Sequence, residues 1–281
     1  MNTQKFSFEF FPPKTKKGIK NLKHTRNTLT KLEPAFFSVT YGAGGTTRDC
    51  TLETVISIQK ESGIDAAPHL SCIGSSQQQM REILQTYKNN GVKRIVALRG
   101  DIPSGMQDIG EFHYANELVS FIREETGDYF HLEVAAYPEK HPQAVSYQAD
   151  LKNFIRKIKA GSNSAITQYF YNIDAYRYFI DDCSQQGINV PIVPGIMPIT
   201  NFTNLARFSD ACGAQIPRWL QTRLEGYGDD IDSIQKLGTE FITEMCAKLL
   251  EENVPGLHFY TMNRIEPSMT IWNNLGLSNL K

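Results

Sequence analysis

The sequence predicts an α/β fold, namely a single (β/α)8 barrel of the TIM type with extra helices between the last two strands. Runs rich in aromatic and β-branched residues alternate with helix-like stretches along the chain, and eight such runs are present. The length of 281 residues is typical of one barrel of this kind. No repeat or interdomain linker interrupts the pattern, so residues 1–281 are predicted to form one domain. A doubly wound sheet is the alternative, although it would usually need fewer strands.

Each predicted strand is a short apolar run bounded by proline, glycine or polar residues. In the first run, Phe6, Phe8 and Phe10 share one face because successive side chains of a strand alternate. Glu9 lies on the opposite face with Ser7, and a lone carboxylate there is costly to bury unless it is paired, protonated or used. The strands are predicted at residues 6–11, 35–41, 66–71, 94–98, 131–136, 165–170, 190–197 and 257–261.

The stretches between the strands carry the residues that begin and end helices. Thr46 or Thr47 can cap the start of the second helix, and Gly91 and Gly161 follow the ends of the third and fifth. Helices are predicted after the first six strands at 19–32, 47–61, 76–89, 114–125, 143–159 and 175–186. Three more precede the last strand, at 203–211, 219–224 and 233–251, and a short one follows it at 266–274.

Composition argues against several classes of protein. The formal net charge is −1 and no long run of one sign is present, which disfavours nucleic acid and anionic membranes as partners. No stretch is apolar for the ~18 residues that a membrane span needs, and no signal peptide precedes the first strand. The five cysteines are scattered without a CxxC pair, which predicts reduced thiols and a cytoplasmic location. The six histidines show no HExxH pattern, so no metal site is predicted.

Polar residues recur where the predicted strands end. A single polar strand end, such as Glu9, can simply be solvated or paired with an arginine. The carboxyl ends of barrel strands meet on one face, however, and seven of the eight ends here are polar, which predicts a lined pocket. These strand-end residues are Glu9, Thr40, Tyr41, His69, Arg99, Gly100, Asp101, Tyr137, Gln168, Tyr260 and Arg264.

Two loops after strands are interpreted as ligand-binding loops. The glycine-rich segment 41–46 lacks the third glycine of a dinucleotide fingerprint, because Thr47 stands there, yet it permits close approach of a ligand to the backbone. Arg99 and Asp101 are predicted to lie on the same face as the alternate strand residues before them. They form either a structural ion pair or a bracket around a polar planar ligand, with Gly100 leaving room for it.

A polar stripe follows the fifth strand. Asp150, Asn153, Arg156 and Lys157 are spaced by three or four residues and share one face of the predicted helix. Such a stripe is often only a solvated surface. Because it follows the strand-end Tyr137 and its proline-bracketed loop, a groove that binds ribose, phosphates and adenine is the alternative, with Arg156 and Lys157 as phosphate donors.

Taken together, eight motifs resemble the bacterial, FAD-dependent 5,10-methylenetetrahydrofolate reductases from the first strand to the last helix. They are FEFFPP at 8–13, SVTYGA at 38–43, APHL at 67–70, ALRGD at 97–101, AYPE at 136–139, TQ at 167–168, PGI at 194–196 and YTMNR at 260–264. The resemblance implies non-covalent FAD at the carboxyl end of the barrel and a ping-pong reaction. NADH or NADPH reduces the flavin, which then passes hydride to methylenetetrahydrofolate and yields 5-methyltetrahydrofolate for methionine synthesis. It also implies a catalytic barrel without a regulatory domain.

The resemblance also implies roles for individual residues. Glu9 matches the catalytic acid, and its burial on an aromatic strand is expected to raise the pKa of its carboxyl toward neutrality. Asp101 matches a catalytic carboxylate between flavin and pterin. Substrate contacts match Thr40, Asp101, Gln168, Phe202, Tyr260 and Arg264. FAD contacts match Tyr41, Ala43, His69, Arg99, Gly100, Asp101, Tyr114, Tyr137, His141, Ala144, Asp150, Asn153, Arg156 and Lys157.

The sequence is also compatible with other functions. A flavin-free, pterin-dependent methyltransferase barrel would also bind folate, and an inactive barrel would serve only as a binding protein. A Schiff-base aldolase would need a lysine at a strand end, and none is found there. A homo-oligomer, either a dimer or a tetramer, is expected from the resemblance. NADH is favoured over NADPH because no separate basic site for a 2′-phosphate can be identified.

Overall fold

The strands of the barrel are short and lie close to their predicted positions. The computed structural model describes residues 4–41, 46–102 and 109–279. Seven strands follow the prediction: β1 (Lys5–Phe10), β2 (Phe36–Val39), β3 (Ala66–Ser71), β4 (Arg94–Leu98), β5 (His131–Ala136), β6 (Ser164–Thr167) and β9 (Gly256–Tyr260). The predicted strand at 190–197 is instead two strands, β7 (Ile192–Val193) and β8 (Gly195–Ile196).

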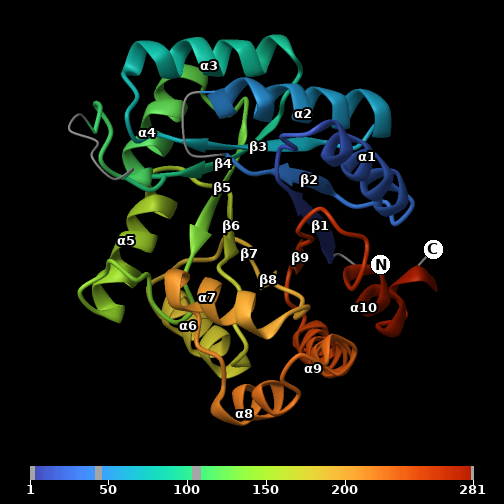
Figure 1. Cartoon of the computed structure of the whole chain (residues 1–281). Helices are drawn as coiled ribbons and strands as arrows, with labels where there is room; N and C mark the ends of the chain where they lie inside the picture. Colours follow the sequence, from blue (N-terminus) through green and yellow to red (C-terminus); the bar gives the residue numbers. More distant parts are fainter. Residues whose placement is uncertain (1–3, 42–45, 103–108, 280–281) are drawn as a thin grey trace.

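These strands form one parallel sheet in the order β7-β6-β5-β4-β3-β2-β1-β9-β8. The two outermost members are neighbours in the chain, separated by Pro194, so the sheet curls into a nearly closed barrel inside a ring of helices (Figure 1). Proline lacks the N–H that a continuous strand would donate. β7 pairs with β6 and β8 pairs with β9, while the Pro194 carbonyl accepts the His258 N–H at 2.9 Å. The predicted barrel is confirmed, and its seventh strand is divided where it closes the circle.

The helices also agree with the prediction. Those after the first six strands are α1 (Lys16–Thr30), α2 (Thr46–Ser62), α3 (Gln77–Asn89), α4 (Ala115–Thr126), α5 (Tyr147–Lys159) and α6 (Ile173–Gln185). The extra helices between β8 and β9 are α7 (Phe202–Cys212), α8 (Arg218–Gly226) and α9 (Ile231–Glu251), and α10 (Ser268–Asn274) and a turn at Leu277–Asn279 follow β9 (Figure 1). No helix in the described ranges is long and apolar enough to cross a membrane.

The first strand separates the two layers of the core. Phe8 and Phe10 are fully buried on its outer face, where the Phe8 ring lies 5.4 Å from Phe259 and 5.9 Å from Trp272 of α10. Ser7 and Glu9 point into the barrel, as the alternation of the strand predicts. Each buried aromatic ring contributes about 2–3 kcal/mol through the area it removes from water, so the outer layer holds the strand and hence Glu9 in place.

The inside of the barrel is filled at its amino end. Phe36 and Val96 pack there, and the Arg94 guanidinium lies 4.5 Å from the centre of the Phe36 ring and pairs with Glu133. Burial alone would raise the pKa of Glu133, but His131 and Arg94 lower it below its ordinary value. Because this end is packed, the open end of the barrel is the one at which the strands finish.

Gly195 of β8 offers a test of barrel closure. A Cβ atom there would lie 2.2 Å from the Thr167 carbonyl oxygen and 2.7 Å from the Tyr260 ring, so we expect Gly195→Ala to lower the free energy of unfolding by about 2–4 kcal/mol. Gly226, at the end of α8, has no neighbour within 4 Å of such an atom among the described residues, so Gly226→Ala should change stability by less than about 1 kcal/mol. Urea unfolding of both variants checks this, and equal losses would contradict it.

Candidate active site

The carboxyl group of Glu9 lies near the open end of the barrel between two histidines. Its Oε2 atom is 3.2 Å from Nε2 of His69, on β3, and 3.6 Å from Nε2 of His258, on β9. The Ser38 hydroxyl of β2 donates to the same oxygen at 3.4 Å. The pairing of β1 with β2 and β9 sets Glu9 opposite Ser38 and Tyr260, so four strands build this cluster.

The electrostatics of Glu9 correct the expectation from the sequence. Burial of its side chain, which is 17% exposed, does favour a higher pKa. The charges and hydrogen bonds of His69 and His258 outweigh that effect and lower the pKa of Glu9 to about 2. The aromatic strand was visible in the sequence, whereas the two imidazoles come from distant strands. Glu9 is therefore a carboxylate in the ligand-free site, and a proton for chemistry has to reach it from a neighbour.

Tyr260 forms the wall next to Glu9. Its hydroxyl donates to the Thr167 carbonyl at 2.7 Å, and burial raises its pKa well above the ordinary value, so it stays protonated. Its ring lies edge-on to the His258 ring with centres 5.3 Å apart. The next residue, Thr261, donates its hydroxyl to the Glu9 carbonyl at 2.6 Å. These contacts fix the ends of β1 and β9 against each other.

A cavity of about 430 Å³ opens beside Tyr260, between the ends of β8 and β9 and the helices α7 and α9. Tyr260 and Arg264 line it, as the sequence predicts for residues at the pocket. Four large apolar side chains that the structure leaves exposed are also part of its wall, namely Phe11, Phe208, Ile231 and Met262. Exposed apolar groups gathered around one opening are typical of a site for a flat organic ligand.

The helix α7 presents Phe208 to the cavity. Phe202 packs against the hydrophobic core, whereas Phe208 is 40% exposed and lines the cavity. Asn201, Asn204 and Leu205 line it as well, and with Phe208 they follow the i, i+3, i+4, i+7 spacing of one helical face. Phe202 is one position off that face. Phe208 is thus an additional candidate for contact with a ligand, and the role of Phe202 as a substrate contact stays a prediction.

A second group of polar residues lies at the ends of β4 and β5. The Tyr137 and His141 rings meet edge to face with centres 4.6 Å apart, and Asp150 accepts the backbone N–H of His141 at 2.7 Å. Burial lowers the pKa of His141, and Asp150 partly opposes this effect. Lys157 donates to the Ala135 carbonyl at the end of β5. These residues form one connected polar surface.

Arg99 and Asp101 do not share a strand face. β4 ends at Leu98, and Gly100 has a φ of 86°, so the alternation of the strand stops before either charge. A Cβ atom at Gly100 would lie 1.8 Å from the Ser71 hydroxyl, so only glycine allows the loop to pass this close to β3. Arg99 donates to Gln143 at 2.5 Å, and Asp101 is exposed to solvent. Arg99 is thus held by the β5–α5 loop, whereas the carboxylate of Asp101 is exposed to solvent.

The polar stripe of α5 divides into two pairs. Asp150 and Lys157, two turns apart, are half-buried against the end of β5, while Asn153 and Arg156 are exposed and hydrogen-bonded to each other at 3.1 Å. Burial lowers the pKa of Lys157 to about 8, although Asp150 opposes this effect. The Lys157 ammonium has three hydrogens, of which one reaches the Ala135 carbonyl. This is its one hydrogen-bond acceptor within the part of the chain that the structure describes, so the other two hydrogens can serve an anion.

With this geometry in view, the comparison with known proteins is decisive. The family model described as methylenetetrahydrofolate reductase matches residues 1–276. The chain belongs to this reductase family. It is 44% identical over 273 residues to the 5,10-methylenetetrahydrofolate reductase of Pectobacterium carotovorum, covering 96% of this chain and 90% of that protein. The Escherichia coli enzyme of the same name is 42% identical with the same coverage.

More distant relatives differ in length or in sequence. The chain is 41% identical to the methylenetetrahydrofolate reductase (NADH) 1 of Arabidopsis thaliana, covering 97% of this chain but 48% of the plant protein. A solved structure from Clostridium thermocellum, described as binding two copies of 5-methyl-5,6,7,8-tetrahydrofolic acid, superimposes with a TM-score of 0.66. It covers 99% of this chain and 96% of that one at 17% identity, which supports the fold.

The other predicted residues that the structure describes follow the strands β2, β4, β5 and β6 in the chain. Thr40 and Tyr41 are half-exposed after β2, and the Thr40 carbonyl accepts the Thr51 hydroxyl at 3.1 Å. Gln168 follows β6 and donates its N–H to the Ala136 carbonyl at 2.7 Å. Tyr114 is 58% exposed at the start of α4, and Ala144 is half-exposed. Ala43 lies outside the described residues.

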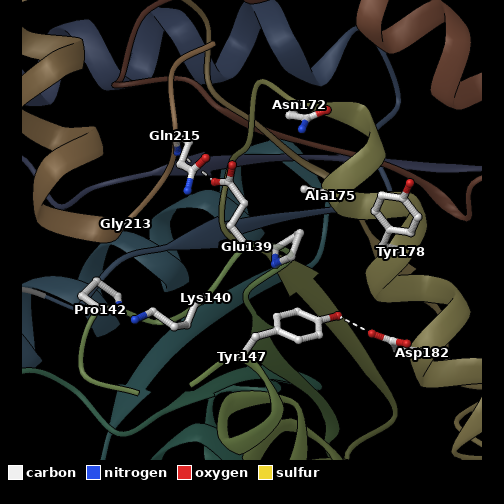
Figure 2. Close-up of a pocket in the computed structure, with 11 residues that line it drawn as sticks. Glu139, Lys140, Pro142, Tyr147, Asn172, Ala175, Tyr178, Asp182, Gly213 and Gln215 are labelled. Atoms are coloured by element: carbon white, nitrogen blue, oxygen red, sulfur yellow. Dashed lines mark hydrogen bonds between the residues drawn. The ribbon is translucent and has the colours of Figure 1, made fainter. Parts of the chain in front are cut away.

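A separate hollow of about 560 Å³ lies beyond the β5–α5 loop (Figure 2). Its residues come from that loop, from the start of α5, from α6 and from the segment before α8. The Tyr147 hydroxyl points to Asp182 and donates to it at 2.8 Å, and Glu139 accepts the Gln215 N–H at 2.9 Å (Figure 2). None of the predicted site residues that the structure describes lines this hollow. Among the described residues, no group of three or more His, Cys, Asp or Glu side chains is placed to hold a metal ion.

Proposed function

We propose that this protein reduces 5,10-methylenetetrahydrofolate to 5-methyltetrahydrofolate, with hydride supplied by NADH or NADPH through FAD. The observation that carries the proposal is the Glu9 carboxylate, placed between His69 and His258 at the open end of the barrel. Membership of the reductase family and the names of its relatives support the same reaction. The exposed apolar cavity beside Tyr260 supports a flat substrate.

The proposed chemistry needs an acid at the site. The methylene bridge of the substrate joins two nitrogens, and it opens to an electrophilic iminium when one nitrogen leaves with a proton. Glu9 supplies that proton in the proposal, because its carboxyl group lies near the open end of the barrel and next to two groups that can hold protons. Tyr260 stays protonated and closes one side of the site. Hydride then adds to the iminium carbon and completes the methyl group.

The cavity fits the two ends of a folate. Its aromatic side chains Phe11 and Phe208 offer faces on which a ring can stack. Arg264, at the same cavity, offers a guanidinium for a carboxylate of the glutamyl tail. Asp101, an exposed carboxylate, is proposed to accept hydrogen bonds from the amino-pyrimidine edge of the pterin. Thr40 and Gln168 are proposed to contact the nicotinamide and the folate in turn.

The donor set at the ends of β4 and β5 fits FAD. Lys157 and Arg156 offer cationic donors to phosphates, Asp150 offers an acceptor to ribose hydroxyls, and Tyr137 and His141 offer ring faces and edges. Gly100, which passes close to Ser71, sets the course of the loop that carries Arg99 and Asp101 at this site. A flavin bound here supplies a two-electron carrier that takes hydride from the nicotinamide and gives it to the folate.

A visible absorption spectrum of the purified protein, or of protein incubated with FAD, tests this proposal. We expect an oxidised-flavin spectrum that bleaches on anaerobic addition of NADH and returns when methylenetetrahydrofolate is added. A protein that takes up no FAD would overturn the proposal and favour a flavin-free pterin barrel. Bleaching without recovery on addition of the folate would instead identify an oxidoreductase for another acceptor.

The assignment of Phe208 can be tested against Phe202. Phe208→Ala should raise KM for methylenetetrahydrofolate by about tenfold to hundredfold. It removes from the cavity wall an aromatic ring whose burial against the substrate is worth about 2 kcal/mol. Phe202→Ala should instead lower Tm and leave KM within about twofold, since that ring packs against the core. Steady-state kinetics and thermal melting of both variants separate the two, and the reverse pattern would favour Phe202 as the substrate contact.

We also propose that the reductase uses NADH in preference to NADPH, forms a homo-oligomer and works in the cytoplasm. The names of the plant relatives, which specify NADH, support the first point. The ratio of kcat/KM for the two nucleotides tests it, and a ratio in favour of NADPH would contradict it. Sedimentation of the holoprotein tests the second point, and a monomer at micromolar concentration would overturn it.

A further inference from the structure

His258 is a buried imidazole behind the proposed acid. Its side chain has no exposed surface, and it lies on β9 inside the barrel. Its Nδ1 atom is 2.7 Å from the Ser7 hydroxyl, and its Nε2 atom is 3.4 Å from the Ser38 hydroxyl and 3.6 Å from Glu9 Oε2. A buried imidazole carries a proton at a high cost unless a carboxylate lies next to it. Glu9 is such a carboxylate.

The surroundings of His258 leave Glu9 as its exchange partner. Tyr260 lies edge-on at 5.3 Å between ring centres and remains protonated, so it takes no proton. The Phe36 ring stacks at 6.0 Å and has the Arg94 guanidinium 4.5 Å from its centre. His69 is on another strand and meets the same Glu9 oxygen. Among the described residues, Glu9 is therefore the carboxylate in ion-pair range of His258.

The contact atoms show which way a proton can move. The hydroxyl of Ser7 meets Nδ1, and this contact can hold a hydrogen on Nδ1 in both charge states of the ring. Nε2 is then the ring nitrogen that is placed to exchange a hydrogen with Glu9, which it faces at 3.6 Å. His69, whose side chain is 12% exposed, links the same carboxylate to the surface. The cluster thus has a fully buried end at His258 and a partly exposed end at His69.

We propose that His258 holds the proton that Glu9 delivers to the folate. This inference rests on the proposed function. As the C–N bond of the methylene bridge breaks, its electron pair stays on the leaving nitrogen, which takes a proton from Glu9. Glu9 receives the Nε2 proton of His258, so the carboxylate is unchanged, His258 becomes neutral and the leaving nitrogen gains one hydrogen. A proton from solvent, passed along the His69 side, restores His258 before the next turnover.

Replacing His258 by asparagine tests the inference, because asparagine keeps a polar side chain but holds no exchangeable charge. In anaerobic stopped-flow measurements, flavin reduction by NADH should stay within about twofold of wild type. Flavin reoxidation by methylenetetrahydrofolate should slow by roughly tenfold to hundredfold, the lower part of what proton transfer contributes. The dependence of this rate on pH should also change, because the group that passes a proton to Glu9 is missing.

His131 provides a matched control at the other end of the barrel. Its Nε2 atom likewise meets a serine, Ser164 at 2.6 Å, and a glutamate, Glu133 at 3.3 Å. His131→Asn should therefore report the general cost of removing an imidazole from the barrel while the pH profile stays that of wild type. The inference would be overturned if His258→Asn, His131→Asn and wild type had the same rate for the folate half-reaction and the same pH profile.

Ser7→Ala keeps the test open if His258→Asn does not fold. Without the hydroxyl at Nδ1, either ring nitrogen can carry the hydrogen. The folate half-reaction should slow by about threefold to tenfold with a shifted pH profile, and flavin reduction should be unchanged. A wild-type pH profile and rate in Ser7→Ala would overturn the inference. A wild-type protein that reduces no folate would overturn the proposed function itself, which distinguishes the two failures.

Discussion

Replacing Glu9 by glutamine is expected to abolish folate reduction and leave the reaction of the flavin with NADH intact. Glutamine has nearly the same shape and keeps the polar contacts with Ser38 and the histidines, but it cannot deliver a proton. A positioned general acid contributes about 10²–10⁴-fold, so the folate half-reaction should fall by at least ~10²-fold. Stopped-flow absorbance of the flavin, with NADH and then with methylenetetrahydrofolate, measures both halves separately.

Glu61 supplies a control for this variant. The pKa of Glu61 is also lowered to about 2, by hydrogen bonds from Arg26 and Lys23, but Glu61 is at the far end of α2 and away from the cluster. Glu61→Gln should leave both half-reactions within about twofold of wild type. If Glu9→Gln turns over folate as fast as Glu61→Gln does, Glu9 is not the acid, and its place between the histidines has another purpose.

The position of Glu9 could be predicted from the sequence, whereas its chemical state could not. Alternation along β1 is a local property with a period of two residues, and it correctly turns Glu9 into the barrel and the phenylalanines outward. The pKa of Glu9 depends on His258, which is 249 residues later in the chain. That contact exists because β9 pairs with β1 in a particular register. Burial alone gives the wrong direction for the shift.

The same distinction explains the other corrections. The repeated strands and helices predict the barrel, because each element carries its own apolar pattern. The strand predicted at 190–197 is divided because its first half pairs with β6 and its second half with β9. Pro194 lies at the division, but a proline alone does not predict that the two halves pair with different strands. The end of β4 before Arg99 follows from the left-handed Gly100, a backbone state that the sequence permits but does not require.

Replacing Lys157 by methionine is expected to weaken FAD binding by about tenfold to hundredfold. Methionine keeps the apolar stem that lies along α5, but it removes a charged hydrogen bond worth about 1.5–3 kcal/mol to a phosphate. The matched control is Lys159→Met, because Lys159 is in the last turn of the same helix and is exposed. Titration of the apoproteins with FAD, followed by flavin fluorescence, gives both dissociation constants.

The lowered pKa of Lys157 adds a pH dependence to this prediction. Burial brings that pKa to about 8, so between pH 7 and pH 9.5 the free protein loses the ammonium charge. Binding of a phosphate requires the charge, so a proton must be taken up and the FAD dissociation constant should rise above pH 8 in wild type. Lys157→Met should show a much smaller rise over this range, whereas Lys159→Met should follow wild type. A wild-type dissociation constant that is flat from pH 7 to pH 9.5 would mean that Lys157 does not contact the phosphates.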